Sequence, residues 1–317
     1  MIQYFYLGRT DYAAALLLQE ELVELRFNGQ VENVLLLLEH PPVLTLGRNA
    51  NRANVLAPEQ LLASRGVTLH QINRGGDVTY HGPGQLVGYP IFDLRTLRNR
   101  SGGRMGPVDL VRLMEEALIR LCGEFGVRAG RICGLTGVWC GVGSQAESQA
   151  SKPARENNTS VAKARCERAA SNVRAEAPTY QTPPAERKIG AIGIHVARGI
   201  TSHGFAFNVT TDLRDFELIV PCGIPDHAVT SLAREVEQPE QLPGLEAIAH
   251  RAARQFGLVF EEQVLAVESL AALRAQAGSP APSGPKFPAE DTPLKVPAEV
   301  ERLRREAGHP KGPPTLA

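Results

Sequence analysis

Two segments of the chain show contrasting hydrophobic patterns. Residues 34–38 form a continuous apolar run, which is typical of a strand buried on both faces. In residues 107–125 the apolar positions recur at helical spacing, a proline lies in the first turn, and Gly126 follows the last residue. The sequence therefore predicts a central buried strand and a long amphipathic helix.

Shorter apolar segments alternate along the rest of the chain. Strands are expected at residues 4–7, 43–48, 67–72, 136–139, 188–196, 200–209 and 258–260. Helices are expected from Thr10 or Asp11 to Gly29, at 59–64, from a start within 229–232, at 245–256 and through about Ala275. Because helices alternate with strands joined by hairpins, the pattern predicts an α/β or α+β fold with helices packed against a sheet.

Residues 74–85 contain four glycines among polar residues. A short strand signal at 78–80 is followed by a His, by the turn sequence Gly82-Pro83-Gly84 and by a second strand-like run at 86–92, which together predict a β-hairpin. Glycine permits close approach of a ligand to the backbone, so a hairpin with many polar side chains is suited to holding an extended substrate. The alternative is an ordinary tight hairpin without a binding role.

Two segments differ in composition from the rest. Residues 144–186 hold almost no bulky aliphatic side chain and are dominated by Ala, Ser, Glu, Arg, Asn and Pro, so we expect a disordered insertion at a hairpin tip. Residues 277–317 contain nine of the 23 prolines and predict a disordered tail. A single core domain is therefore expected from residues 1–143 and 187–276.

The balanced overall charge argues against nucleic acid and membrane surfaces as partners, but it does not exclude a protein partner. Lys plus Arg equals Asp plus Glu at 34 each, so no net field points to nucleic acid or to a membrane surface. The longest aliphatic run, 34–38, is too short to span a bilayer, and the start of the chain does not resemble a signal peptide. The five cysteines include no C-x-x-C pair, so no zinc site is expected, and the reducing cytoplasm is the expected location.

Cys222 is the strongest candidate nucleophile among the cysteines. It lies between Pro221, which favours extended geometry at the preceding residue, and Gly223, which frees the chain after it. A thiol in this setting can project into a cleft, although most buried cysteines are inert packing residues. Cys122 and Cys133 occur in apolar contexts and are expected to pack in the core.

Lys188 and His81 are the candidate partners of this thiol. Lys188 begins a strand of glycines and aliphatics, and its plainest interpretation is a solvated lysine at a strand end. Beside a cysteine it would stabilise the thiolate and, when partly desolvated, could accept a proton. His81 could be a base, an orienting partner or a structural residue, and we favour an orienting role. The histidines at 40, 195, 203 and 227 are each expected to be structural.

The order of these motifs resembles one enzyme family. The segment Arg74-Gly-Gly-x-x-Thr-Tyr-His-Gly-Pro-Gly-Gln85 closely resembles the signature of the lipoyl(octanoyl) transferases of lipoate biosynthesis. Six further blocks match in order: 38–47, Thr136-Gly-Val-Trp139, Lys188-Ile-Gly-Ala-Ile-Gly193, His203-Gly-Phe-Ala-Phe-Asn208, Pro221-Cys-Gly223 and Val229-Thr-Ser-Leu232. The resemblance covers residues 3–265 except for the insertion, which stands where the family has a short turn.

The resemblance implies a fold similar to the biotin and lipoate protein ligases, with a mixed sheet flanked by helices, and acyl transfer without a metal or cofactor. Cys222 would attack the thioester of octanoyl-acyl carrier protein, and Lys188 would activate the thiol and then help to deprotonate the incoming amine. That amine would be a lysine of the lipoyl domain of a 2-oxoacid dehydrogenase, or of the glycine-cleavage H protein. The matching substrate-contacting positions are Arg74, Gly75, Gly76, Asp77, Val78, Thr79, Tyr80, His81, Ala191, Ile192, Gly193, Gly204, Phe205 and Ala206.

Two other functions are compatible with such a fold. An ATP-dependent lipoate or biotin ligase would activate a carboxylate as an adenylate and would need no cysteine nucleophile. A non-catalytic scaffold could bind lipoyl domains with Cys222 merely packed. The sequences His81-Gly82-Pro83-Gly84 and Pro221-Cys222-Gly223 favour the transferase over the ligase.

Overall fold

The computed structural model describes residues 1–99, 102–142, 186–224, 227–267 and 269–277. In chain order the elements are β1 (Ile2–Arg9), α1 (Tyr12–Phe27), β2 (Asn33–Glu39), β3 (Val43–Leu46), η1 (Arg52–Asn54), α2 (Glu59–Ser64), β4 (Thr68–Gln71), β5 (Val78–His81), β6 (Gln85–Ile91), α3 (Pro107–Gly123), β7 (Ala129–Ile132), β8 (Leu135–Cys140), β9 (Arg187–Ala197), β10 (Ile200–Asn208), η3 (Leu213–Leu218), η4 (Pro221–Gly223), β11 (Ala228–Val229), α5 (Leu232–Glu235), η5 (Pro239–Gln241), α6 (Leu245–Phe260), β12 (Val264–Ala266) and α7 (Leu270–Ala277).

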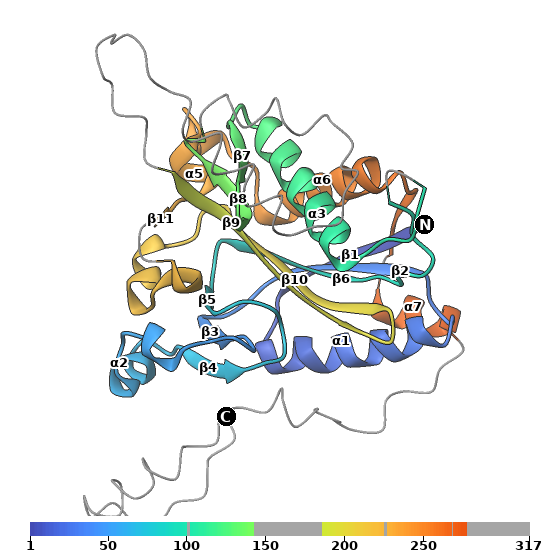
Figure 1. The fold of residues 1–317 in the computed structure, drawn as a ribbon, viewed down its shortest axis with the longest axis horizontal. Helices are drawn as coiled ribbons and strands as arrows, with labels where there is room; N and C mark the ends of the chain where they lie inside the picture. The colour runs from blue at the N-terminus through green and yellow to red at the C-terminus, as the bar shows by residue number, and fades with distance from the viewer. Residues whose placement is uncertain (100–101, 143–185, 225–226, 268, 278–317) are drawn as a thin grey trace, which may run out of the picture.

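A mixed sheet lies at the centre of the molecule (Figure 1). Its strand order is β12-β1-β2-β6-β10-β9-β8-β7, and β11 pairs with β9 off this path. Strand β1 runs parallel to β2 and β12, whereas β2, β6, β10, β9 and β8 pair antiparallel to one another. Helices α1 and α7 lie on one side of the sheet and α3 and α6 on the other. The predicted sheet flanked by helices is confirmed.

Strand β2 explains why its sequence is apolar throughout. Leu35 and Leu37 belong to the core that includes residues of α3 and α6, while Leu36 and Leu38 belong to the core that includes α1. All four side chains are fully buried, because successive residues of a strand point to opposite faces and both faces are covered. Each such burial contributes roughly 1.5–3 kcal/mol. The predicted doubly buried strand is confirmed.

The predicted hairpin is wrong, although its turn forms. Strand β5 pairs with β3 in a separate three-stranded sheet of order β4-β3-β5, and β6 pairs with β2 and β10 in the large sheet. The turn at residues 82–84 leads the chain from the small sheet into the large one. It is held by hydrogen bonds from the Val209 and Thr210 N–H groups to the Gly84 carbonyl at 3.1 and 2.9 Å. Local sequence could not show this, since the partners of both strands come from distant segments.

Two smaller predictions also differ from the structure. The expected strand 258–260 is the last turn of α6, where Phe260 stacks on Phe256 with ring centroids 5.6 Å apart, and the strand follows as β12. The helix expected to start within 229–232 does begin there, at Leu232, after Ala228–Val229 has paired with β9. Cys122 is buried as expected, but Cys133 lies exposed in the turn between β7 and β8, not in the core.

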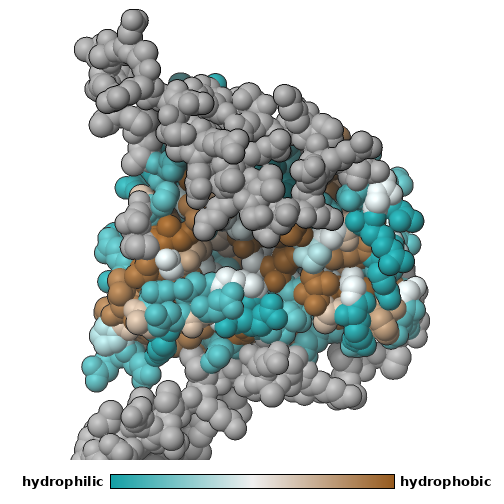
Figure 2. Space-filling model, viewed as in Figure 1, coloured by the Kyte–Doolittle hydropathy of each residue, from teal (hydrophilic) through white to brown (hydrophobic). Residues whose placement is uncertain are grey.

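The predicted insertion and tail fall outside the described residues at 144–185 and 278–317, so their disorder and the domain bounds stay predictions. Among the described helices, none combines the length and apolarity needed to cross a membrane. On the face shown in Figure 2, apolar surface gathers at the level of the central strands, and the surface below it is mainly hydrophilic.

Candidate active site

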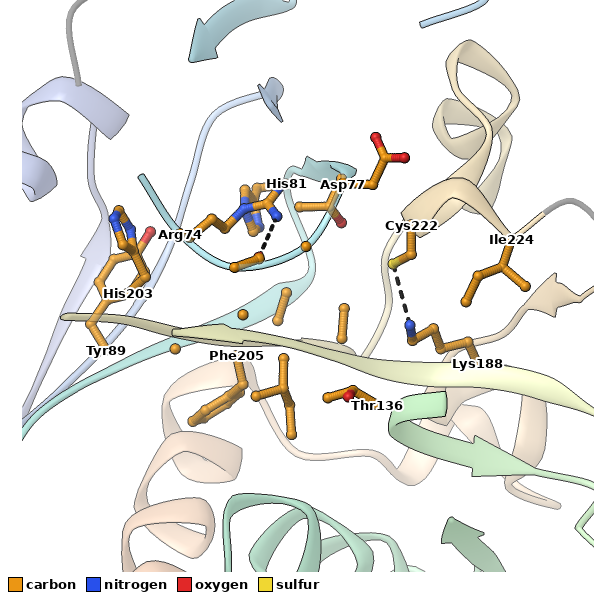
Figure 3. A pocket seen from close by; sticks show the side chains of 18 of the residues that line it. Arg74, Asp77, His81, Tyr89, Thr136, Lys188, His203, Phe205, Cys222 and Ile224 are labelled. Atoms are coloured by element: carbon orange, nitrogen blue, oxygen red, sulfur yellow. Dashed lines mark hydrogen bonds between the residues drawn. The ribbon is translucent and has the colours of Figure 1, made fainter. Parts of the chain in front are cut away.

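Folding brings Lys188 and Cys222 into contact. The Lys188 ammonium lies 3.3 Å from the sulfur of Cys222, and the two side chains point toward each other across one end of a cavity (Figure 3). Lys188 comes from β9 and is 8% exposed, while Cys222 comes from η4 and is partly exposed. A desolvated ammonium beside a thiol stabilises the thiolate, which is the nucleophilic form of cysteine.

The backbone at Cys222 is unusual. Its φ of 56° and ψ of 17° lie in the left-handed region, which costs a residue with a Cβ on the order of 1–3 kcal/mol. Val220 is extended as expected, and its N–H donates to the Asn54 carbonyl at 2.7 Å. Val55 also forms a bridge with Ile219. The segment around η1 thus holds the strained loop from one side.

Trp139 lies next to the amine of Lys188. The Lys188 nitrogen is 5.0 Å from the centre of the Trp139 ring, a distance at which an ammonium is attracted to the aromatic face. The Trp139 side chain is fully buried, and His227 packs edge-on against it with ring centroids 5.1 Å apart. The lysine is therefore enclosed by the sulfur on one side and by an aromatic ring on another.

The cavity beside this pair has a volume of about 170 Å³. Its apolar lining includes Ile192 and Phe205. Every predicted substrate-contacting residue lines it except Val78 and Tyr80, whose side chains lie in the core of the small sheet. The predicted residues that line it are Arg74, Gly75, Gly76, Asp77, Thr79, His81, Ala191, Ile192, Gly193, Gly204, Phe205 and Ala206. Phe207, which follows Ala206 on β10, packs in the core with residues of β2.

Arg74 fastens the glycine-rich loop, residues 74–77, to β3. Its guanidinium donates to the carbonyl and hydroxyl oxygens of Thr45 at 2.7 and 2.9 Å. Burial lowers the pKa of Arg74, although Cys222 and Asp77 act in the opposite direction. The loop also touches β9, since the Gly75 N–H donates to the Ile194 carbonyl at 3.0 Å. A Cβ at Gly193 would lie 2.6 Å from the Gly75 carbonyl oxygen, so this approach requires glycine.

His81 lies on the cavity wall, and its observed partner is Gln85, not Lys188 or Cys222. The ring nitrogen Nδ1 is 2.8 Å from the Gln85 Oε1, and burial lowers the pKa of His81 to about 3. Gln85 in turn donates to Asn208 at 2.9 Å, and Asn208 donates to the Thr230 carbonyl at 2.9 Å. The Thr230 N–H then donates to the carbonyl of Lys188 at 2.9 Å. His81 is thus a neutral member of a network that ends on the backbone of the lysine.

Sequence reasoning missed several residues of the site. The additional lining residues are Tyr12, Tyr89, Thr136, His203 and Ile224. His203 was expected to be structural; it does bond Asn73 at 2.8 Å, but it also lines the cavity. Thr136 belongs to the block Thr136-Gly-Val-Trp139, which resembles the transferase family, and this match could have identified it as a site residue. Among the described residues no group of three or more His, Cys, Asp or Glu side chains is placed to hold a metal ion.

The chain is similar to known proteins over most of its length. Residues 11–257 match the family model described as the lipoyl protein ligase A/B catalytic domain. A curated protein of Acidobacterium capsulatum named octanoyltransferase is 52% identical over 270 residues, which cover 85% of this chain and 94% of the relative. A protein of the same name from Koribacter versatilis is 43% identical over 309 residues, covering 98% of this chain and 99% of the relative.

Solved structures agree on the fold. The bipartite lipoate protein ligase of Thermoplasma acidophilum superposes with a TM-score of 0.54 at 13% identity, covering 88% of this chain and 91% of the ligase. P. falciparum LipL1, solved in complex with lipoate, gives a TM-score of 0.52 at 10% identity, with coverage of 88% and 71%. These distant matches show the fold, and the closer relatives show the family. The chain therefore belongs to the lipoyl protein ligase A/B family and, within it, to the octanoyltransferases.

Proposed function

We propose that the chain moves an octanoyl group from octanoyl-acyl carrier protein to a lysine of lipoyl domains through a thioester on Cys222. The observation that carries this proposal is the 3.3 Å contact between the Lys188 amine and the Cys222 sulfur at one end of a cavity with apolar walls. A ligase could share this fold without a lysine–cysteine pair. The pair therefore favours a mechanism in which the octanoyl group is bound covalently to the enzyme during transfer.

In the first half-reaction the Cys222 thiolate attacks the thioester carbonyl of the donor. A new carbon–sulfur bond forms on Cys222, the bond to the donor sulfur breaks, and the donor thiolate takes a proton from the Lys188 ammonium. The backbone of Gly76 lies on the same cavity wall and can supply an amide donor to the oxyanion. This step leaves an octanoyl-enzyme and a neutral Lys188.

In the second half-reaction the neutral Lys188 amine accepts the proton that the incoming lysine loses. The acceptor nitrogen forms an amide with the octanoyl carbonyl, the bond to Cys222 breaks, and thiolate and ammonium are restored together. One proton thus moves onto and off Lys188 in each cycle. The position of Lys188 supports this role, since its amine lies 3.3 Å from the sulfur that would carry the octanoyl group.

The octanoyl chain is proposed to lie between the glycine-rich loop and strands β9 and β10. Ala191, Ile192 and Phe205 offer apolar surface there, and each buried methylene contributes about 0.8 kcal/mol. The acceptors we propose are lipoyl domains of 2-oxoacid dehydrogenases and the glycine-cleavage H protein. We place the reaction in the cytoplasm, where both carriers would be met.

The proposal is tested by the intact mass of the full chain after incubation with octanoyl-acyl carrier protein in the absence of ATP. An octanoyl adduct is expected on the wild type and none on Cys222→Ala. Cys140→Ala is the matched control, because that thiol is buried in β8 and does not line the cavity. A requirement for ATP would indicate a ligase, and the absence of any adduct on the wild type would leave a binding scaffold.

A further inference from the structure

The backbone of Gly137 in β8 touches the side chain of Lys188. A Cβ placed at Gly137 would lie 2.7 Å from the Lys188 Cε and 2.5 Å from the Gly190 carbonyl oxygen, and the φ of Gly137 is +125°. Both the contact and the backbone angle require glycine. Trp139 follows on the same strand after a register shift, pairs with Lys188 of β9, and places its ring 5.0 Å from the amine. Strand β8 therefore supports Lys188 at two points.

The peptide of Gly137 is in turn held by Glu115 of α3. The Gly137 N–H donates to Glu115 Oε1 at 3.0 Å, while Oε2 accepts from Arg112 at 2.7 Å and from Arg131 at 3.0 Å. The Glu115 side chain is 0% exposed. A buried carboxylate is costly unless it is paired and hydrogen-bonded, and here both oxygens are used. One oxygen is neutralised by arginines and the other is aimed at the strand that carries Gly137.

We propose that Glu115 is a positioning residue for the reaction: its hydrogen bond to Gly137 holds the surface against which Lys188 lies, and so maintains the contact between the amine and the Cys222 sulfur. The inference depends on the proposed role of that pair. Glu115 touches neither the sulfur nor the amine; it acts through the peptide of Gly137. Without this bond the buried N–H would lose its partner, and the strand would shift to find another.

The consequence is a change in the reactivity of the thiol with pH. Among the described residues, the charged groups that face Cys222 besides Lys188 are Arg74 and Asp77, and neither is linked to Glu115 by a hydrogen bond. Around Lys188, His227 packs behind Trp139 and bonds Glu186 at 3.2 Å, and Arg187 is paired with Glu235 at 2.9 Å. Moving the ammonium away removes the nearest positive charge, so Cys222 would react only at higher pH.

The test measures the rate of alkylation of Cys222 by iodoacetamide from pH 5 to 10 on the full chain, with the modified peptide quantified by mass spectrometry. It needs no acyl donor, so its outcome is independent of whether the proposed transfer occurs. In Glu115→Met the pH of half-maximal alkylation should rise by about 0.5 or more. Lys188→Ala, which removes the ammonium altogether, should shift this pH in the same direction. Glu115→Gln keeps an acceptor for the Gly137 N–H and should follow the wild type.

Glu116→Gln is the matched control, because Glu116 pairs with Arg131 and Arg120 but makes no bond to Gly137. In a Lys188→Ala background, Glu115→Met should add no further shift. Gly137→Ala provides a second route to the same displacement if Glu115→Met fails to fold. The proposal is overturned if Glu115→Met, or Gly137→Ala in its place, alkylates like the wild type. It is equally overturned if Glu115→Gln shifts as far as Glu115→Met, or if the shift persists without Lys188.

Discussion

The carboxylate of Asp77 lies against Gly223, the residue that follows Cys222. A Cβ at Gly223 would be 2.5 Å from Asp77 Oδ2, which itself accepts a hydrogen bond from the Asn54 side chain at 2.5 Å. The backbone of Asn54 also accepts the N–H of Val220. The glycine-rich loop, η1 and the loop that carries Cys222 therefore form one connected unit, although they are far apart in the sequence.

Gly223→Ala should strongly reduce formation of the octanoyl-enzyme. The φ of Gly223 is +68°, and the added methyl would collide with Asp77, so the Cys222 loop must move. We expect at least a roughly tenfold slower appearance of the adduct by intact mass, since small displacements of reacting groups are costly. Gly66→Ala is the control: its φ is +65° but nothing lies within 4 Å of the added methyl. That variant should lose about 1 kcal/mol of stability and keep its acylation rate; equal loss of acylation in both variants would show that backbone strain alone is responsible.

Lys188→Ala should slow both half-reactions by about 10²-fold or more, the usual contribution of a positioned acid–base group. The first step loses the ammonium 3.3 Å from the sulfur, and the second loses the proton acceptor. The two rates can be separated by following adduct formation first and then its loss on addition of an acceptor lipoyl domain. Unchanged rates in both steps would remove Lys188 from the mechanism.

Arg74→Lys should reduce both stability and acylation, although it keeps the positive charge. The guanidinium donates to both oxygens of Thr45 and to the Gly75 carbonyl, and a lysine cannot reproduce this geometry from a buried position. We expect loss of stability of about 1–3 kcal/mol in urea unfolding, from the unsatisfied buried groups, together with slower acylation. Arg52→Lys is the control, since Arg52 is exposed and pairs only loosely with Glu59 at 3.5 Å. If Arg74→Lys unfolds with the midpoint of Arg52→Lys, the guanidinium does not hold the loop.

Three of the buried histidines should make the fold sensitive to mild acid, and burial also lowers the pKa of a fourth, His70. Burial lowers the pKa of His40 to about 4 and the pKa values of His81 and His203 to about 3, from an ordinary value of 6.5. Below pH 6.5 the unfolded chain binds protons that the folded chain does not, so the free energy of unfolding falls as the pH is lowered toward 4. The three groups together contribute a slope of up to about 4 kcal/mol per pH unit.

Urea unfolding at pH 7, 6 and 5 measures this slope. His81→Asn should reduce it by about a third, because one of the three titrating groups is removed. His250→Asn is the control, since the His250 side chain is 48% exposed. Stability that stays constant from pH 7 to 5 would contradict the assignment of these histidines as buried and neutral.

The sequence by itself determined the features that depend on local pattern. The apolar run of β2 predicted burial on both faces, and the spacing in α3 predicted its helix, because burial and periodicity are encoded in adjacent residues. The order of short motifs was enough to indicate the family and to single out Lys188 and Cys222. Cysteine and lysine are residue types that can carry chemistry, so their neighbours in the sequence are informative even without coordinates.

Tertiary structure decided which segments meet. Only the pairing of strands showed that β5 and β6 belong to different sheets, and only the fold turned Val78 and Tyr80 away from the cavity. The contact made by Glu115 was also visible only in the fold. In the sequence, Glu115 is one more polar position of an amphipathic helix. Its hydrogen bond to Gly137 joins residues 22 positions apart, and such contacts depend on packing between elements, which no local pattern encodes.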